Sequence, residues 1–140
     1  MKLWDKGIKI DEKIEQFTVG NDREIDMHIA KYDVNASLAH AKMLFSIGII
    51  TAIELQQLEK GLSILEKQIH EGTFVIESQF EDVHSKIEFE LINMFGEVGK
   101  KIHTARSRND QVLVALQLYY KDQLQTIKGL VGTFFDTLLN

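Results

Sequence analysis

Residues 109–140 read NDQVLVALQLYYKDQLQTIKGLVGTFFDTLLN, and this stretch decides the architecture of the chain. Apolar side chains recur along it at steps of three and four, which is typical of an α-helix. The main stripe comprises Leu113, Leu116, Tyr120, Ile127, Leu130, Phe134 and Leu138, and a second set, Val114, Leu118, Leu124, Val131, Phe135 and Leu139, widens it. A helix that is apolar on most sides is buried on most sides. We therefore predict one long helix covered by later parts of the chain, by other subunits, or by both.

Shorter helical patterns precede this stretch. The predicted ranges are 21–48, with a break near 33–35, then 51–72, and 80–95. Thr51 and Glu54 have the spacing of a capping box. The apolar stripe of the first range comprises Ile25, Ile29, Tyr32, Ala36, Ala39, Met43 and Ile47. The short Gly48–Ile50 connection predicts that the first two ranges form a helical hairpin.

The predicted fold class is all-α, in two parts. Residues 1–108 form an N-terminal helical domain. Residues 109–140 form the start of a helix-bundle domain that we expect to be truncated. Residues 1–20 show no lasting periodicity, so we predict an extended arm there, anchored by Trp4 and Phe17.

Composition excludes several classes of protein. The chain has 140 residues, no cysteine and no proline. Disulfides and thiolate metal sites are therefore excluded, and long helices with few connections are favoured. No apolar run approaches the ~18 residues that a membrane span needs, and the N-terminus is too polar for a signal peptide. A net charge of -5 disfavours a general nucleic-acid binder. These features predict a cytoplasmic protein that binds neither membrane nor nucleic acid.

The segment GKKIHTARSRNDQ at 99–111 is the most informative for function. It places five basic residues just before the start of the long helix, where free backbone N–H groups and the helix dipole favour an anion. Arginine adds a planar fork that matches a carboxylate, and Ser107 and Asn109 add donors. This pattern fits a pocket for a small anionic ligand. A solvated basic loop with Asn109 or Asp110 as helix cap fits it too, as does, less well, a nucleic-acid patch.

A second cluster lies at 81–88. Glu81, His84 and Glu88 fall at steps of three and four, on one helix face. Such a face can bind metal or hold a histidine for proton transfer, but it is more often an exposed polar face. We therefore predict no metal site. Asp82 fits the start of the helix, where a negative charge complements the dipole.

Five segments together resemble the argininosuccinate lyase family of the fumarase/aspartase superfamily, along essentially the whole chain. They are KLW at 2–4, YDV at 32–34, SLAHAKML at 37–44, EDVH at 81–84 and HTARSRNDQ at 103–111. The resemblance implies an enzyme that cleaves argininosuccinate to arginine and fumarate by β-elimination without a cofactor. It also implies a homotetramer around a bundle of long helices.

Matching residue by residue, the resemblance implies that Ser107, Arg108 and Asn109 form a substrate-carboxylate loop. Asp82 and His84 resemble the family's other N-terminal site segment. The family's acid and base segments match positions beyond residue 140. We therefore expect no catalytic residue in this chain, and no lyase activity from residues 1–140 alone.

Two positions depart from the family pattern. Ala105 stands where the family usually has glycine, which reduces backbone freedom in the loop. Asp22 stands where the family usually places a substrate-binding serine, and its charge would repel a substrate carboxylate.

Three other functions remain open at this point. The first is a non-catalytic structural relative of the kind found among lens crystallins. The second is another superfamily lyase, such as one acting on adenylosuccinate, which the SRNDQ segment at 107–111 disfavours. The third is a helix-turn-helix nucleic-acid binder, which the few basic residues after Asn109 disfavour.

Overall fold

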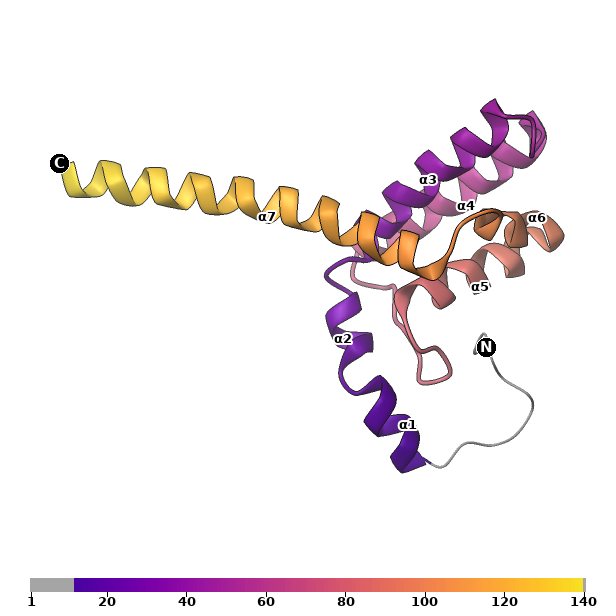
Figure 1. The fold of residues 1–140 in the computed structure, drawn as a ribbon, viewed down its shortest axis with the longest axis horizontal. Coiled ribbons are helices and arrows are strands. Elements are labelled where there is room, and N and C mark those ends of the chain that lie inside the picture. The colour runs from indigo at the N-terminus through magenta and orange to yellow at the C-terminus, as the bar shows by residue number, and fades with distance from the viewer. Residues whose placement is uncertain (1–11, 140) are drawn as a thin grey trace.

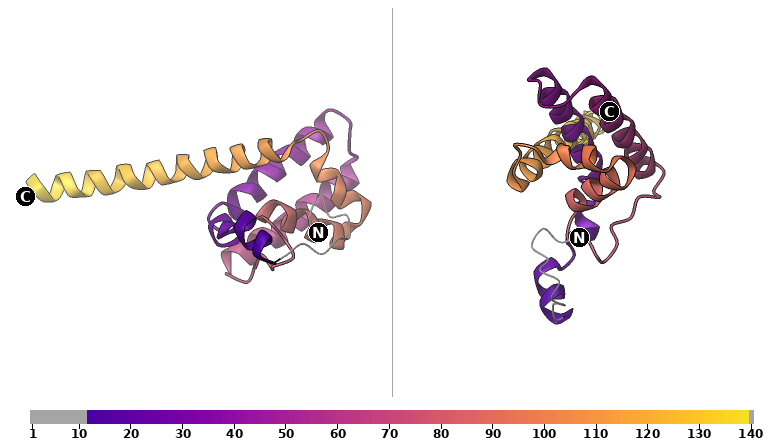
Figure 2. Two further views of the ribbon diagram at one scale, coloured as in Figure 1. Left: turned by 60° about the horizontal axis from the view of Figure 1, so that its bottom comes forward. Right: turned by 90° about the vertical axis from the view of Figure 1, so that its right-hand side faces the viewer.

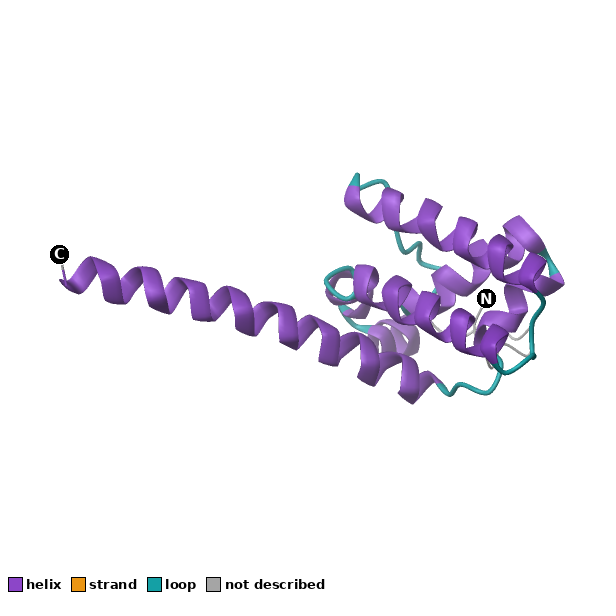
Figure 3. Cartoon of the chain, turned by 90° about the horizontal axis from the view of Figure 1, so that it is seen from above, coloured by secondary structure: helices purple, strands orange, loops and turns teal. Residues whose placement is uncertain are grey.

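The computed structural model describes residues 12–139, and over this range the chain is helical and contains no strand (Figures 1 and 3). The predicted all-α class is therefore confirmed. The elements are α1 (Glu12–Val19), α2 (Asp22–Asp26), α3 (Ala30–Ser46), α4 (Ala52–His70), α5 (Val83–Phe95), α6 (Glu97–Lys100), the short 3₁₀ helix η1 (Lys101–His103) and α7 (Arg108–Leu139).

Helices α3 and α4 form the predicted helical hairpin, and α5 packs against it (Figures 1 and 2). The core consists mainly of apolar side chains from these three helices and the segment between α4 and α5, with Ile29, Ile50, Ile102 and Ala115 beside them. Its fully buried large members are Leu44, Leu58, Leu62, Leu65, Phe80, Ile87 and Leu91. The predicted capping box starts α4: Thr51 Oγ1 accepts a hydrogen bond from the Glu54 N–H, and Glu54 Oε2 accepts one from the Thr51 N–H.

The first helical range differs from the prediction in two ways. The break lies between α2 and α3, at 27–29, and not near 33–35, which is helix interior. The predicted apolar stripe is confirmed only in part, because Ile29, Tyr32 and Ala36 are buried but Ile25, Met43 and Ile47 are exposed. The buried residues of α3 are Ala30, Tyr32, Asp33, Val34, Ala36, Ser37, Ala41 and Leu44. Two polar residues on the core face hid it from a search based on apolar spacing alone.

The predicted extended arm is also wrong over its described part. Residues 12–19 form α1, and Phe17 is 90% exposed, so this side chain anchors nothing. Trp4, the other predicted anchor, lies outside the described residues. A helix of two turns is too short to show a lasting period, so apolar spacing could not reveal it.

Helix α6 folds back tightly on α5. Gly96 at the end of α5 has a positive φ of 59°, which allows the reversal. Gly99 then lies so close to α5 that an added Cβ would collide with the backbone carbonyl group of Leu91. The sequence predicted only a loop here. The close approach matters for function because η1 and the 104–107 segment follow directly and lead into α7.

Helix α7 is continuous, as predicted, and extends away from the folded part (Figures 1 and 2). The first half of α7 packs on α3, with Gln111 and Ala115 buried near its start. Farther along, the Tyr32 hydroxyl donates to Asp122 Oδ2 at 2.5 Å. Most large apolar side chains of its second half are exposed, namely Leu124, Ile127, Leu130, Val131, Phe134, Phe135, Leu138 and Leu139. No described helix is both long enough and apolar enough for a membrane span.

Candidate functional site at the start of α7

The N-terminus of α7 is closed by a reciprocal cap. Ser107 precedes the first helical residue, and its Oγ accepts a hydrogen bond from the Asp110 N–H at 3.2 Å. The Asp110 carboxylate accepts in return from the Ser107 N–H at 2.8 Å and from its hydroxyl. These two bonds hold the pKa of Asp110 below its usual value. Ser107 is therefore the helix cap, Asp110 is its partner, and the predicted alternative cap Asn109 takes no part.

The capped end of α7 presents free hydrogen-bond donors. Within the described residues, neither the Arg108 nor the Asn109 backbone N–H donates a hydrogen bond, and the Asn109 side chain is exposed and makes none. The first N–H groups of a helix lack intrahelical partners and lie at the positive end of the dipole. The two amides and the Asn109 side chain can therefore bind a carboxylate from outside the chain.

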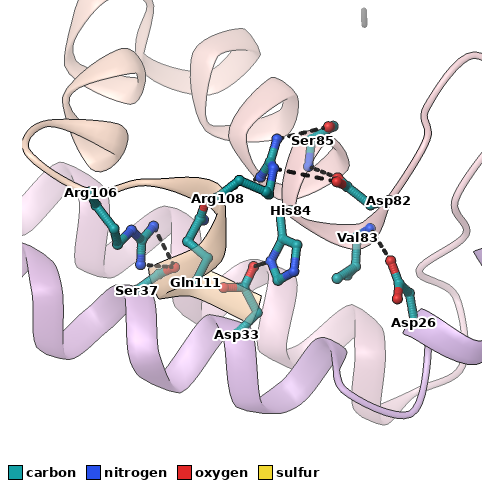
Figure 4. A network of polar contacts seen from close by, with 10 residues as sticks. All are labelled: Asp26, Asp33, Ser37, Asp82, Val83, His84, Ser85, Arg106, Arg108 and Gln111. Atoms are coloured by element: carbon teal, nitrogen blue, oxygen red, sulfur yellow. Dashed lines mark hydrogen bonds and ion pairs between the residues drawn. The ribbon is translucent and has the colours of Figure 1, made fainter. Parts of the chain in front are cut away.

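Arg108 joins the two predicted site segments (Figure 4). Its Nη2 donates to Ser85 Oγ at 3.1 Å, and its Nε lies 3.4 Å from Asp82 Oδ2. Its Nη1 donates to Gln111 Oε1 at 3.0 Å. Much of the guanidinium fork that the sequence assigns to an external carboxylate is thus occupied by the chain itself. Two of its five N–H donors remain for a ligand.

Asp82 occupies the N-terminus of α5 and serves two partners. Its Oδ1 accepts from the Ser85 N–H at 2.7 Å, which caps the helix, while its Oδ2 faces Arg108. The adjacent Val83 N–H donates to Asp26 Oδ2 at 3.0 Å, so α2 also holds this turn. Burial raises the pKa of Asp26, and the hydrogen bond from the Val83 N–H opposes this rise only in part. The turn at 82–85 is thereby fixed from both α2 and α7.

His84 lies beneath this surface and not on it. The side chains of His84 and Asp33 are 2% and 0% exposed, and His84 Nδ1 lies 2.9 Å from Asp33 Oδ2 (Figure 4). Little of the His84 side chain can contact substrate in this arrangement, and its predicted role in substrate binding stays a prediction. Among the described residues, no group of three or more side chains could hold a metal ion.

The sequence missed the support that α3 gives to the loop before α7. Both terminal nitrogens of Arg106 donate to Ser37 Oγ, at 3.3 and 3.2 Å. Burial lowers the pKa of Arg106, and the negative charge of Asp33 opposes that shift. His40 Nε2 lies 2.9 Å from the Thr104 carbonyl oxygen. The signal was present in the sequence, because Asp33, Ser37 and His40 belong to the YDV and SLAH segments, but the resemblance assigned these residues no role.

Both departures from the family pattern lie at this site. Ala105 has a φ of +55°, in the left-handed region that favours glycine. Asp22 lines a cavity of about 290 Å³ together with Thr18, Val19, Glu81 and Asp82. Three carboxylates therefore share this cavity, and its wall repels an anion. This cavity is therefore a poor place for an anion, in contrast to the free N–H groups at the start of α7.

Comparison with known proteins decides the family. A family model described as "Lyase" matches residues 6–140. The chain belongs to this lyase family. Argininosuccinate lyase of Thermotoga neapolitana is 53% identical to this lyase chain over 130 residues, which are 93% of the chain and 33% of that protein. The argininosuccinate lyase of Bacteroides thetaiotaomicron is 47% identical over 138 residues, covering 99% of the chain and 31% of that protein.

A third relative gives the same relation. Argininosuccinate lyase of Phocaeicola vulgatus is 48% identical over 139 residues, covering 99% of the lyase chain and 31% of that protein. The chain thus spans about a third of the length of the curated relatives that it matches.

Proposed function

We propose that the protein to which this chain belongs is an argininosuccinate lyase, and that the chain supplies a carboxylate-binding part of its active site. The observation that carries the proposal is the start of α7. There, free amides, the Asn109 side chain and Arg108 converge, and Arg108 connects them to the Asp82 segment. Relatives named argininosuccinate lyase that are about half identical to the chain support the substrate assignment.

The proposed reaction is a β-elimination. A base removes a proton from the carbon next to a substrate carboxylate, and the electron pair forms the new double bond. The bond from the neighbouring carbon to the guanidino nitrogen breaks, and an acid protonates that nitrogen, which gives arginine and fumarate. Donors aimed at the carboxylate stabilise the negative charge that develops on it. We assign Arg108 and Asn109 to this task, and we assign Ser107, whose N–H and hydroxyl both donate to Asp110, to holding the loop as the helix cap.

We assign Asp82 and His84 to the second wall of the site. Asp82 holds the Arg108 guanidinium at 3.4 Å and so fixes its direction. His84 is buried directly beneath and acts through the first turn of α5. The acid and base would come from parts of the full-length protein that match the remaining two thirds of the relatives. No cofactor is needed for this chemistry.

The long apolar face of α7 supports the partner proposal. Side chains such as Leu130 and Phe134 are well over half exposed in this chain. A contiguous patch of this kind exceeds what monomeric proteins usually expose. We propose that it is buried in a helix bundle of a homotetramer, and that the protein acts in the cytoplasm.

A direct assay tests the function. The full-length protein is incubated with argininosuccinate, and fumarate is followed by its ultraviolet absorbance, with adenylosuccinate as the comparison substrate. Fumarate release from argininosuccinate alone is expected. Release from adenylosuccinate alone would point to a different superfamily lyase, and no release from either would point to a non-catalytic relative.

A further inference from the structure

One face of α3 lies under both parts of the proposed site. Asp33, Ser37 and His40 occur at steps of four and three, which places them on the same side of the helix. All three reach site segments that are distant in the sequence: His84 at the start of α5, and Arg106 and Thr104 before α7. We call these three residues the α3 support. Figure 4 shows two of them, Asp33 and Ser37, pointing toward the two segments.

The Asp33 side chain is fully buried, and its nearest partner is His84 Nδ1 at 2.9 Å. A carboxylate in the interior is costly unless a cation or donor accompanies it. His84 lies one residue from Val83 and two from Asp82, in the first turn of α5. Asp33 on α3 therefore contacts that turn through His84, while Arg108 on α7 contacts it through Asp82 and Ser85.

The other two members hold the loop. Ser37 Oγ accepts hydrogen bonds from both terminal nitrogens of Arg106, the residue before the cap residue Ser107. His40 Nε2 faces the Thr104 carbonyl oxygen, and since a carbonyl oxygen only accepts, this nitrogen is the donor. Burial and the charge of Arg106 lower the pKa of His40, which favours the neutral ring with one N–H. The loop is thus fixed on both sides of the strained Ala105.

We propose that Asp33, Ser37 and His40 are positioning residues that keep the Asp82–Ser85 turn and the Ser107–Asn109 loop in register for one substrate carboxylate. This proposal rests on the proposed function. Asp33 and Ser37 are fully buried, so they act through His84 and Arg106 and not by touching substrate. Residues that orient the groups in contact with a ligand commonly decide how well a site is formed.

The test uses the full-length protein with Asp33→Ala, Asp33→Asn and Ser37→Ala. Lys86→Met is the matched control, because Lys86, on α5, is also a buried polar residue but pairs with Glu77 and Glu90. For each variant we measure kcat, KM, the dissociation constant of succinate by calorimetry, and the melting temperature. Succinate serves as a non-reacting dicarboxylate.

Ser37→Ala is expected to weaken succinate binding and raise KM about tenfold, because Arg106 and the loop are released. Asp33→Ala should lower kcat/KM at least tenfold, and Asp33→Asn should cause a smaller decrease, because the amide keeps the size of the carboxylate and its 2.9 Å contact with His84 Nδ1. Lys86→Met should lower the melting temperature while kcat/KM stays within twofold. If Asp33→Ala does not fold, the Asp33→Asn and Ser37→Ala results decide.

The proposal is overturned if the Asp33 and Ser37 variants behave like Lys86→Met, losing only thermal stability. Failure of the proposed function has a different signature, since it is seen in the unaltered protein. If that protein binds succinate but releases no fumarate, the function is wrong, and the succinate constants of the variants still decide the positioning role. If that protein neither binds succinate nor releases fumarate, both proposals fall.

Discussion

Arg108 and Asp82 tie the N-terminus of α7 to the N-terminus of α5, with Nε and Oδ2 3.4 Å apart. Asp82 also caps α5 through the Ser85 N–H, so one carboxylate orders both helix ends. Asn109, the next residue along α7, is exposed and makes no such contact within the described chain. The two neighbours therefore differ: Arg108 links the two helix ends, whereas the exposed Asn109 side chain makes no hydrogen bond within the described residues.

This difference predicts two distinct mutational effects in the full-length protein. Asn109→Ala should reduce kcat/KM by about 30- to 1000-fold, equivalent to ~2–4 kcal/mol, because a donor to the carboxylate is lost. Its melting temperature should not change. Arg108→Ala should lose activity and also thermal stability, because three internal contacts disappear. Steady-state kinetics and calorimetry on both variants check this, and an active Asn109→Ala enzyme would show that this side chain does not bind substrate.

Ala105 provides a test of backbone strain in the loop. A left-handed alanine costs on the order of 1 kcal/mol relative to glycine. Ala105→Gly should therefore increase the free energy of unfolding by about that amount in urea denaturation. Ala39→Gly, in the interior of α3, should instead decrease it by roughly 0.5–1 kcal/mol. A loss of stability in both variants would contradict the strain assigned to Ala105.

Gly99 and Gly132 make a matched pair for close packing. An added Cβ at Gly99 would meet the backbone of Leu91, whereas Gly132 on α7 has open space around it. Gly99→Ala should lower the free energy of unfolding by about 1–3 kcal/mol, because backbone must move. Gly132→Ala should raise it by roughly 0.5–1 kcal/mol, because alanine favours a helix interior. Equal effects at the two positions would mean that α6 does not lie against α5 as described.

The contact between α3 and α7 should depend on pH. The Tyr32 hydroxyl, followed by Lys31, holds the pKa of Asp122 below its usual 3.8. The folded state therefore favours the carboxylate, and this stabilisation is complete above pH 3.8 and is lost as pH falls through the lowered pKa. Tyr32→Phe should unfold at a lower urea concentration than the unaltered chain at neutral pH, and this difference should shrink below that pH. Tyr120→Phe, which removes an exposed hydroxyl, is the control; a pH-independent difference for Tyr32→Phe would refute the linkage.

The exposed stripe of α7 predicts self-association of the 140-residue chain. Helices that pack side by side at about 20° would bury Leu130, Phe134 and Leu138. Sedimentation velocity at micromolar concentration should show dimers or larger species, and glutamate at these three positions should give a monomer. A control with Gln125→Glu and Lys128→Glu, on the polar face, should still associate. If the unaltered chain is a monomer in which α7 is ordered, this prediction is contradicted.

The sequence predicted the elements with strong periodicity better than the contacts between them. The capping box at Thr51 and the continuous α7 follow from local spacing and are confirmed. The buried face of α3 was predicted only in part, at Tyr32 and Ala36, because it also includes Asp33 and Ser37, whose partners are distant in the sequence. Likewise, the loop at 103–109 was recognised as a candidate anion site, but its internal use of Arg108 depends on α5. Tertiary pairing of polar groups is invisible to a periodic pattern.

Helix α7 begins directly after the loop that contains Ser107 and runs for 32 residues without a break. It is therefore a rod about 48 Å long, and the free N–H groups of Arg108 and Asn109 lie at one end of it. A tilt of about 5° at the loop would carry the far end through roughly 4 Å. Conversely, a contact that holds the far end of α7 to within about 1 Å holds the direction of the helix axis at its start to about one degree. Long-range packing along this helix can thus set the aim of a side chain such as Asn109 more finely than the loop could by itself.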